Sequence, residues 1–127
     1  MNILVIDDEP LIHLSIEKLI LSCSENSHVY HASNGRQMLE LLKEHRFQLA
    51  YVDIKMPGLS GLEAIRLAKE VSPSTHYYIM TGFNEFEYAK QAVKLKVEDY
   101  LMKPLDQKTI WETIQTAELL EMSNQRE

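Results

Sequence analysis

Two adjacent acidic residues, Asp7 and Asp8, directly follow a short apolar run at the start of the chain. Neighbouring carboxylates raise each other's pKa unless a positive charge lies between them. Three further polar residues end later apolar runs: Asp53, Thr81 and Lys103. Mg²⁺ takes oxygen ligands and commonly shares its coordination shell with a phosphate. These residue types therefore indicate a site for a divalent cation and a phosphate, provided that the fold brings them together.

The elements that must position these residues alternate along the chain. Apolar runs predict strands at 2–6, 28–32, 48–52, 76–80 and 99–102. Helical spacing and capping residues predict helices at 10–23, 34–45, 61–71 and 84–95, and a last helix from 106. Five such units predict an α/β fold: one doubly wound, five-stranded parallel sheet flanked by five helices. The carboxyl ends of its strands share one edge, where ligands bind.

Composition indicates a single globular domain. The chain has 127 residues, of which 45% are hydrophobic and 25% charged, and its net charge is −6. An acidic chain does not favour direct nucleic-acid binding, which needs a basic surface. We expect one domain over residues 1–121, followed by a polar tail or linker stub at 122–127.

Cysteine usage and hydropathy predict a cytoplasmic protein. The single cysteine, Cys23, cannot form a disulfide within the chain, which is typical of a reducing compartment. The N-terminus lacks a basic leader, and no run approaches the ~20 apolar residues of a membrane span. We therefore expect no membrane association.

Four motifs end the predicted strands in order: ILVIDDE, YVDIKMPGLSG, IMTG and DYLMKP. Together they resemble the receiver domain of two-component response regulators, and the resemblance covers nearly the whole chain. It implies a flavodoxin-like fold of the receiver type and a phosphorylation-dependent signalling switch. Such a switch catalyses only its own phosphorylation and dephosphorylation and turns over no separate substrate, so it is not an enzyme in the usual sense.

The resemblance also implies the roles of individual residues. Asp53 is the expected phosphoacceptor and a Mg²⁺ ligand, Asp8 a direct Mg²⁺ ligand, and Asp7 a ligand through water. The backbone carbonyl of Lys55, two residues after the phosphoacceptor, completes the protein's share of the coordination.

The remaining expected roles concern the phosphoryl group and the switch. Thr81 and Lys103 are expected to bind phosphoryl oxygens, and the bond from Lys103 to Pro104 is expected to be cis. Tyr100 matches the aromatic residue that turns inward together with Thr81 on activation. This movement is expected to change the surface of the fourth helix, fifth strand and fifth helix, where Tyr88 and other apolar residues lie.

The implied partners are a sensor histidine kinase and a second copy of the chain, which forms a homodimer on phosphorylation. The stretch GFNEFEYAKQAVKLKVEDYLMKP is similar to receivers fused to an arabinose-regulator-type helix-turn-helix domain. This similarity implies control of transcription, with DNA bound only by a separate output domain.

Two other functions share parts of this pattern. An aspartyl-phosphate-type phosphatase normally has a second Asp two residues after its nucleophile, where this chain has Lys55. A flavodoxin-like cofactor binder needs a loop rich in Ser, Thr and Gly after the first strand, where this chain has DDEP.

Two further features do not belong to the implied site. Lys96 occupies a helix end where the family usually has glycine, so it must adopt a left-handed conformation or the helix end must be rebuilt. The five histidines show no metal-ligand spacing and are expected to be surface or hydrogen-bonded residues: His13, His28, His31, His45 and His76.

Overall fold

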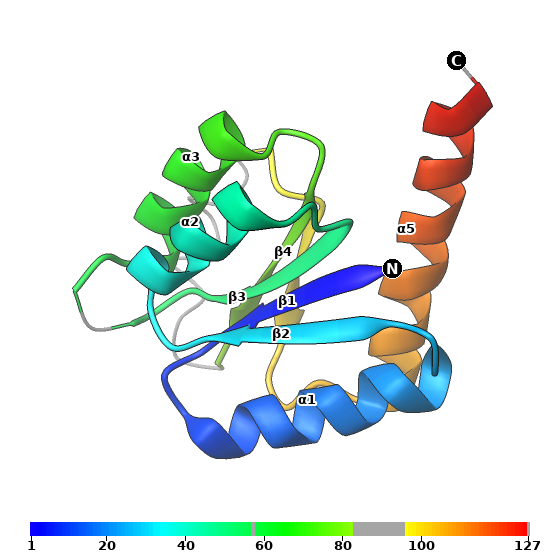
Figure 1. Cartoon of the computed structure of the whole chain (residues 1–127). Helices are drawn as coiled ribbons and strands as arrows, with labels where there is room; N and C mark the ends of the chain where they lie inside the picture. Colours follow the sequence, from blue (N-terminus) through cyan, green and yellow to red (C-terminus); the bar gives the residue numbers. More distant parts are fainter. Residues whose placement is uncertain (57, 83–95, 127) are drawn as a thin grey trace.

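The computed structural model of the chain describes residues 1–56, 58–82 and 96–126. Five strands form one parallel sheet in the order β2-β1-β3-β4-β5 (Figure 1). Their bounds are β1 Asn2–Ile6, β2 His28–Ala32, β3 Leu49–Asp53, β4 His76–Thr81 and β5 Asp99–Met102. The predicted doubly wound parallel sheet is confirmed, with boundaries within one residue of those expected. All strands point their carboxyl ends to the same edge.

In the part of the chain that the structure describes, four helices cover the sheet, two on each face (Figure 1). They are α1 Pro10–Cys23, α2 Gly35–Glu44, α3 Gly61–Val71 and α5 Gln107–Arg126. The helices α1 and α5 pack on one face, and α2 and α3 on the other. The helix predicted at 84–95, including Tyr88, lies outside the described residues.

The helix starts follow the predicted capping residues. The Asn34 side chain accepts a hydrogen bond from the N–H of Gln37, and Ser60 accepts one from Glu63. Asp106 likewise accepts from Thr109 at the start of α5. These bonds satisfy N–H groups that have no partner within the helix.

The end of α5 lies in the stretch expected as a polar tail or linker stub. The helix continues to Arg126, through most of the stretch 122–127. None of the residues in this stretch is a glycine or proline, so nothing in the sequence stops the helix there.

The outer face of α5 exposes Trp111, which is 51% accessible, together with Leu119 and Met122. Among the described helices, none is both long and apolar enough for a membrane span.

The central strands are buried on both faces, as is typical of a parallel sheet. One face of the core contains Leu4, Ile6, Met38, Phe47, Val52 and Ile65. The other contains Ile3, Val5, Ile20, Tyr51, Met80 and Ile110. All five residues of β3 are buried, including the charged residue Asp53 at its end. The fold therefore holds this carboxylate in an interior position.

A polar contact inside the core joins β3 to α5. The Tyr51 hydroxyl is hydrogen-bonded to the Thr113 hydroxyl, which in turn donates to the carbonyl of Ile110. Both side chains are buried. Since an unpaired buried hydroxyl is costly, this contact fixes α5 against the strand that carries Asp53.

Two backbone positions shape the connections near the strand ends. A side chain at Gly61 would collide with the backbone of Asp53 and Ile54, because an added Cβ would lie 2.1 Å from the Asp53 carbonyl oxygen. Only glycine therefore lets α3 begin this close to β3. Lys96 has a φ of 55°, so of the two expected alternatives it adopts the left-handed conformation.

Candidate functional site

Three carboxylates meet at the carboxyl edge of the sheet. Asp7 follows the last residue of β1, and Asp53 ends the neighbouring strand β3. Together with Asp8 they offer oxygen atoms that all lie within 4.8 Å of one another. Asp7 and Asp53 are buried, whereas Asp8 is exposed. We call these three residues the acidic cluster.

Lys103 places its ammonium group between the two buried carboxylates. Its Nζ atom lies 3.0 Å from Asp7 Oδ2 and 3.1 Å from Asp53 Oδ1. The peptide bond to Pro104 is cis, as expected. The Lys103 N–H also donates to the Thr81 carbonyl at 2.8 Å, which fixes this segment to the end of β4. The positive charge that the adjacent acids require is therefore supplied within the chain.

The surroundings shift the pKa values of both charged groups. Burial, followed by the negative charge of Asp7, raises the pKa of Asp53 from 3.8 to about 6, although Lys103 opposes the shift. Burial alone would lower the pKa of Lys103, but its contacts with Asp7 and Asp53 outweigh that effect and raise it. The lysine therefore stays charged, whereas the ionised form of Asp53 is less favoured than that of an ordinary aspartate.

The other predicted residues lie at or near the same edge. Thr81 is fully buried at the end of β4, and its hydroxyl donates to the Gly82 carbonyl at 3.2 Å. The Lys55 N–H donates to Asp53 Oδ1 at 3.4 Å. Tyr100 lies on β5 opposite Ile79 and is 38% exposed, so its side chain is on the surface and not inward.

The donor set fits a magnesium ion. Three carboxylates provide hard oxygen ligands, and the exposure of Asp8 leaves a side open for water, which Mg²⁺ retains in most of its protein sites. Three negative charges and the Lys103 ammonium sum to −2, which a divalent cation would balance.

The sequence matches the response regulator receiver domain family over residues 3–115. The chain belongs to this family. It is thus a receiver domain of the kind found in two-component response regulators. Family membership favours this interpretation over the phosphatase and the flavodoxin-like cofactor binder.

Similar proteins support the same assignment. The chain is 42% identical over 79 residues to the uncharacterized transcriptional regulatory protein YesN of Bacillus subtilis, covering 62% of this chain and 22% of that protein. It is 34% identical over 116 residues to the transcriptional regulatory protein ZraR of Escherichia coli, covering 91% and 26%. It therefore spans only about a quarter of the length of these relatives.

Solved receiver structures superpose closely. The REC domain of AraT, a response regulator from Geobacillus stearothermophilus, has a TM-score of 0.87 at 36% identity, with 97% of both chains covered. A response regulator receiver domain protein from Clostridium thermocellum has a TM-score of 0.82 at 31% identity, covering 91% of this chain and 92% of that one. These likenesses confirm the receiver fold.

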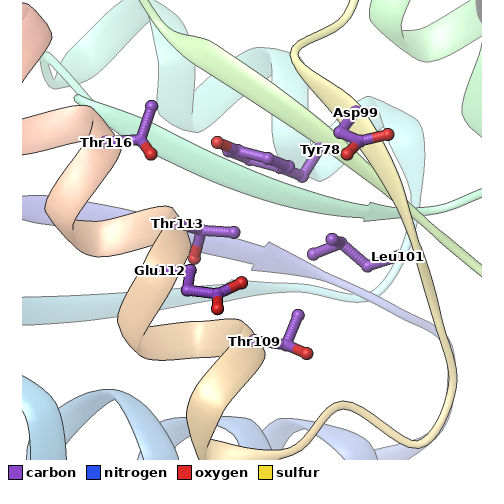
Figure 2. A pocket seen from close by; sticks show the side chains of 7 residues that line it. All are labelled: Tyr78, Asp99, Leu101, Thr109, Glu112, Thr113 and Thr116. Atoms are coloured by element: carbon purple, nitrogen blue, oxygen red, sulfur yellow. The ribbon is translucent and has the colours of Figure 1, made fainter.

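Sequence reasoning missed a pocket between β4, β5 and α5. Its volume is about 170 Å³, and it is lined by Tyr78, Asp99, Leu101, Thr109, Glu112, Thr113 and Thr116 (Figure 2). The Tyr78 hydroxyl points across it toward Thr116. No residue of the acidic cluster lines this pocket. The signal in the sequence was the spacing of Thr109, Glu112 or Thr113, and Thr116 along one side of α5.

Sequence reasoning also missed a contact between two histidines. His13 on α1 and His31 on β2 approach to 2.7 Å between their Nδ1 atoms. They are 18 positions apart in the chain, so spacing gave no indication of the contact. The two residues are called the histidine pair below.

Proposed function

We propose that this receiver domain is a phosphorylation switch in which Asp53 accepts a phosphoryl group from the phosphohistidine of a sensor kinase. The observation that carries the proposal is the buried Asp53 carboxylate with Lys103 Nζ at 3.1 Å and two further carboxylates beside it. A carboxylate oxygen forms the new bond to phosphorus, the bond from phosphorus to the kinase histidine breaks, and the histidine leaves.

The chain's own residues position this reaction. Mg²⁺ would be held by four groups: the carboxylates of Asp8 and Asp53, Asp7 through water, and the Lys55 carbonyl. When bound, the ion would neutralise charge on the transferred group. The Lys103 ammonium is placed to bind a phosphoryl oxygen, because it already lies within 3.1 Å of Asp53. Phosphoryl transfer needs mainly positioning and charge neutralisation, and this edge supplies both.

The test is phosphorylation by acetyl phosphate in the presence of Mg²⁺, followed by intact-mass measurement. The wild type should gain the mass of one phosphoryl group, and Asp53→Asn should gain none. Asp99→Asn, which changes an exposed acid at the other end of β5, is the matched control and should label fully. Labelling of Asp53→Asn at the wild-type level would refute the assignment.

A groove beside the acidic cluster supports docking of the kinase. It is lined by Leu11, Leu14, Ser15, Lys18, Leu19 and Leu105. Leu11 and Leu14 are 78% and 54% exposed, and both α1 and the segment after Lys103 lead directly away from the site. Exposed apolar surface of this kind is typical of a protein-binding site. Leu14→Arg should slow transfer from a phosphorylated kinase and leave labelling by acetyl phosphate unchanged.

The proposed switch links Thr81 to Tyr100. Phosphate adds about −1.5 to −2 charge and strong acceptors, so the Thr81 hydroxyl should leave the Gly82 carbonyl and donate to the phosphoryl group. Tyr100, which is exposed in this structure, would then turn into the vacated space. Thr81→Ala should still accept phosphate but lose most phosphate-dependent homodimer formation. Dimerisation of this variant at the wild-type level would contradict the route.

The output we propose is transcription, controlled from the cytoplasm through a separate DNA-binding domain. Support comes from the relatives, because YesN and ZraR are transcriptional regulatory proteins by name. The domain itself carries a net charge of −6, which does not favour DNA contact. It turns over no separate substrate in this proposal.

A further inference from the structure

The histidine pair joins helix α1 to the edge strand β2. The two rings are nearly perpendicular, with an interplanar angle of 80° and ring centroids 4.7 Å apart. His13 is half-buried, whereas His31 is exposed to solvent. The closest atoms are the two Nδ1 nitrogens, at 2.7 Å.

The outer nitrogens of both rings have partners that can only accept hydrogen bonds. His13 Nε2 lies 2.6 Å from the Asp7 carbonyl oxygen, and His31 Nε2 lies 3.1 Å from Glu17 Oε1. A carbonyl and a carboxylate have no proton to donate, so each Nε2 must carry the hydrogen. In a neutral imidazole the other nitrogen is then an acceptor. When both rings are neutral, two Nδ1 lone pairs therefore face each other.

Two facing lone pairs at this distance repel unless a positive centre lies between them. Neutral imidazole nitrogen is a preferred ligand of Zn²⁺ and related divalent transition ions. Histidines that bind metals usually donate their other N–H to a carboxylate or a backbone carbonyl, which fixes the ring and makes it a better ligand. Glu17 and the Asp7 carbonyl provide these two acceptors.

We propose that His13 and His31 bind a divalent transition ion of the Zn²⁺ class through their Nδ1 atoms. With zinc–nitrogen bonds of about 2.0–2.1 Å in a tetrahedral site, the two nitrogens must move roughly 0.6 Å apart. Solvent exposure of His31 on an edge strand gives room for this shift. Water completes the shell, so binding is weaker than at a site with four protein ligands.

This site differs in chemistry from the acidic cluster. Carboxylate oxygens favour Mg²⁺, whereas imidazole nitrogens favour softer ions. The contact of the pair with the cluster at His13 Nε2 is to the backbone carbonyl of Asp7 and not to a carboxylate. Zinc binding can therefore be measured while excess Mg²⁺ occupies the acidic cluster.

The test is a Zn²⁺ titration of the whole chain in excess Mg²⁺, followed by NMR of the histidine ring nitrogens. The Nδ1 signals of His13 and His31 should shift while their Nε2 atoms stay protonated, and the other three histidines should not respond. His31→Gln should weaken binding at least tenfold. His28→Gln changes an exposed histidine of the same strand and is the matched control.

Three results would overturn the proposal. One is that Zn²⁺ shifts the ring-nitrogen signals of no histidine, or shifts those of all five histidines alike. Another is equal Zn²⁺ affinity in His31→Gln and His28→Gln. The third is a proton shared between the two Nδ1 atoms that Zn²⁺ does not displace at slightly alkaline pH. Circular dichroism checks the fold of each variant, and His13→Gln repeats the test from the other ring.

Discussion

The acidic cluster and the histidine pair both involve Asp7, but they differ in burial and in the groups that surround them. The Asp7 carboxylate faces Lys103 in the interior, and its carbonyl accepts the His13 N–H. The cluster holds two buried carboxylates, Asp7 and Asp53, beside the Lys103 ammonium, whereas the pair has one ring, His31, that is open to water. Burial, more than the number of ligands, should therefore decide how strongly each site affects stability.

The largest expected effect is loss of the counter-charge in the cluster. Lys103→Met leaves Asp7 and Asp53 without the ammonium that lies between them. Breaking a buried ion pair from one side costs about 3–5 kcal/mol, and the open side at Asp8 points to about 3 kcal/mol here. Urea unfolding in EDTA at neutral pH measures this loss in the free energy of unfolding. Lys43→Met, at an exposed lysine, should change stability by less than about 0.5 kcal/mol.

The second expected effect comes from removing the charge of Asp53 while keeping the size and shape of its side chain. Its pKa is raised from 3.8 to about 6, so ionised Asp53 destabilises the folded state above pH 6. Asp53→Asn should therefore raise the free energy of unfolding by about 2 kcal/mol at neutral pH in EDTA. The gain should shrink as pH falls from about 6 and vanish below about 4, where both states bind the proton. A gain independent of pH would argue against this origin.

A smaller effect is expected from Mg²⁺ itself. An ion that binds only the folded state stabilises it by about 1.4 kcal/mol at ten times its dissociation constant. Mg²⁺ should raise the melting temperatures of the wild type and of His31→Gln equally. It should raise the melting temperature of Asp8→Asn much less. A Mg²⁺ response that depends on His31 and not on Asp8 would reverse the assignment of the two sites.

The smallest expected effect lies at the histidine pair. His31→Gln removes an exposed contact to Glu17, so the free energy of unfolding without metal should change by less than about 0.5 kcal/mol. Urea unfolding in EDTA is again the measurement. A loss as large as that of Lys103→Met would show that the two sites do not differ in the way proposed.

The two sites also differ in how far the sequence predicts them. Acids at the ends of β1 and β3 meet because regular β/α alternation places parallel strand ends at one edge, and this follows from pattern alone. The histidine pair depends on how α1 crosses an edge strand, which periodicity does not determine. The end of α5 at Arg126 is likewise not marked by pattern, since the sequence there has no stop signal. Packing angles and unmarked helix ends require the structure.

Trp111 gives the unmodified protein an optical reporter. It is the chain's only tryptophan, and it is half-exposed on the outer face of α5. A protein that docks on this outer face would exclude water from the indole and move its emission to shorter wavelengths. Ions at the acidic cluster or the histidine pair do not cover this side chain. Fluorescence can therefore follow occupancy of α5 in real time without a label.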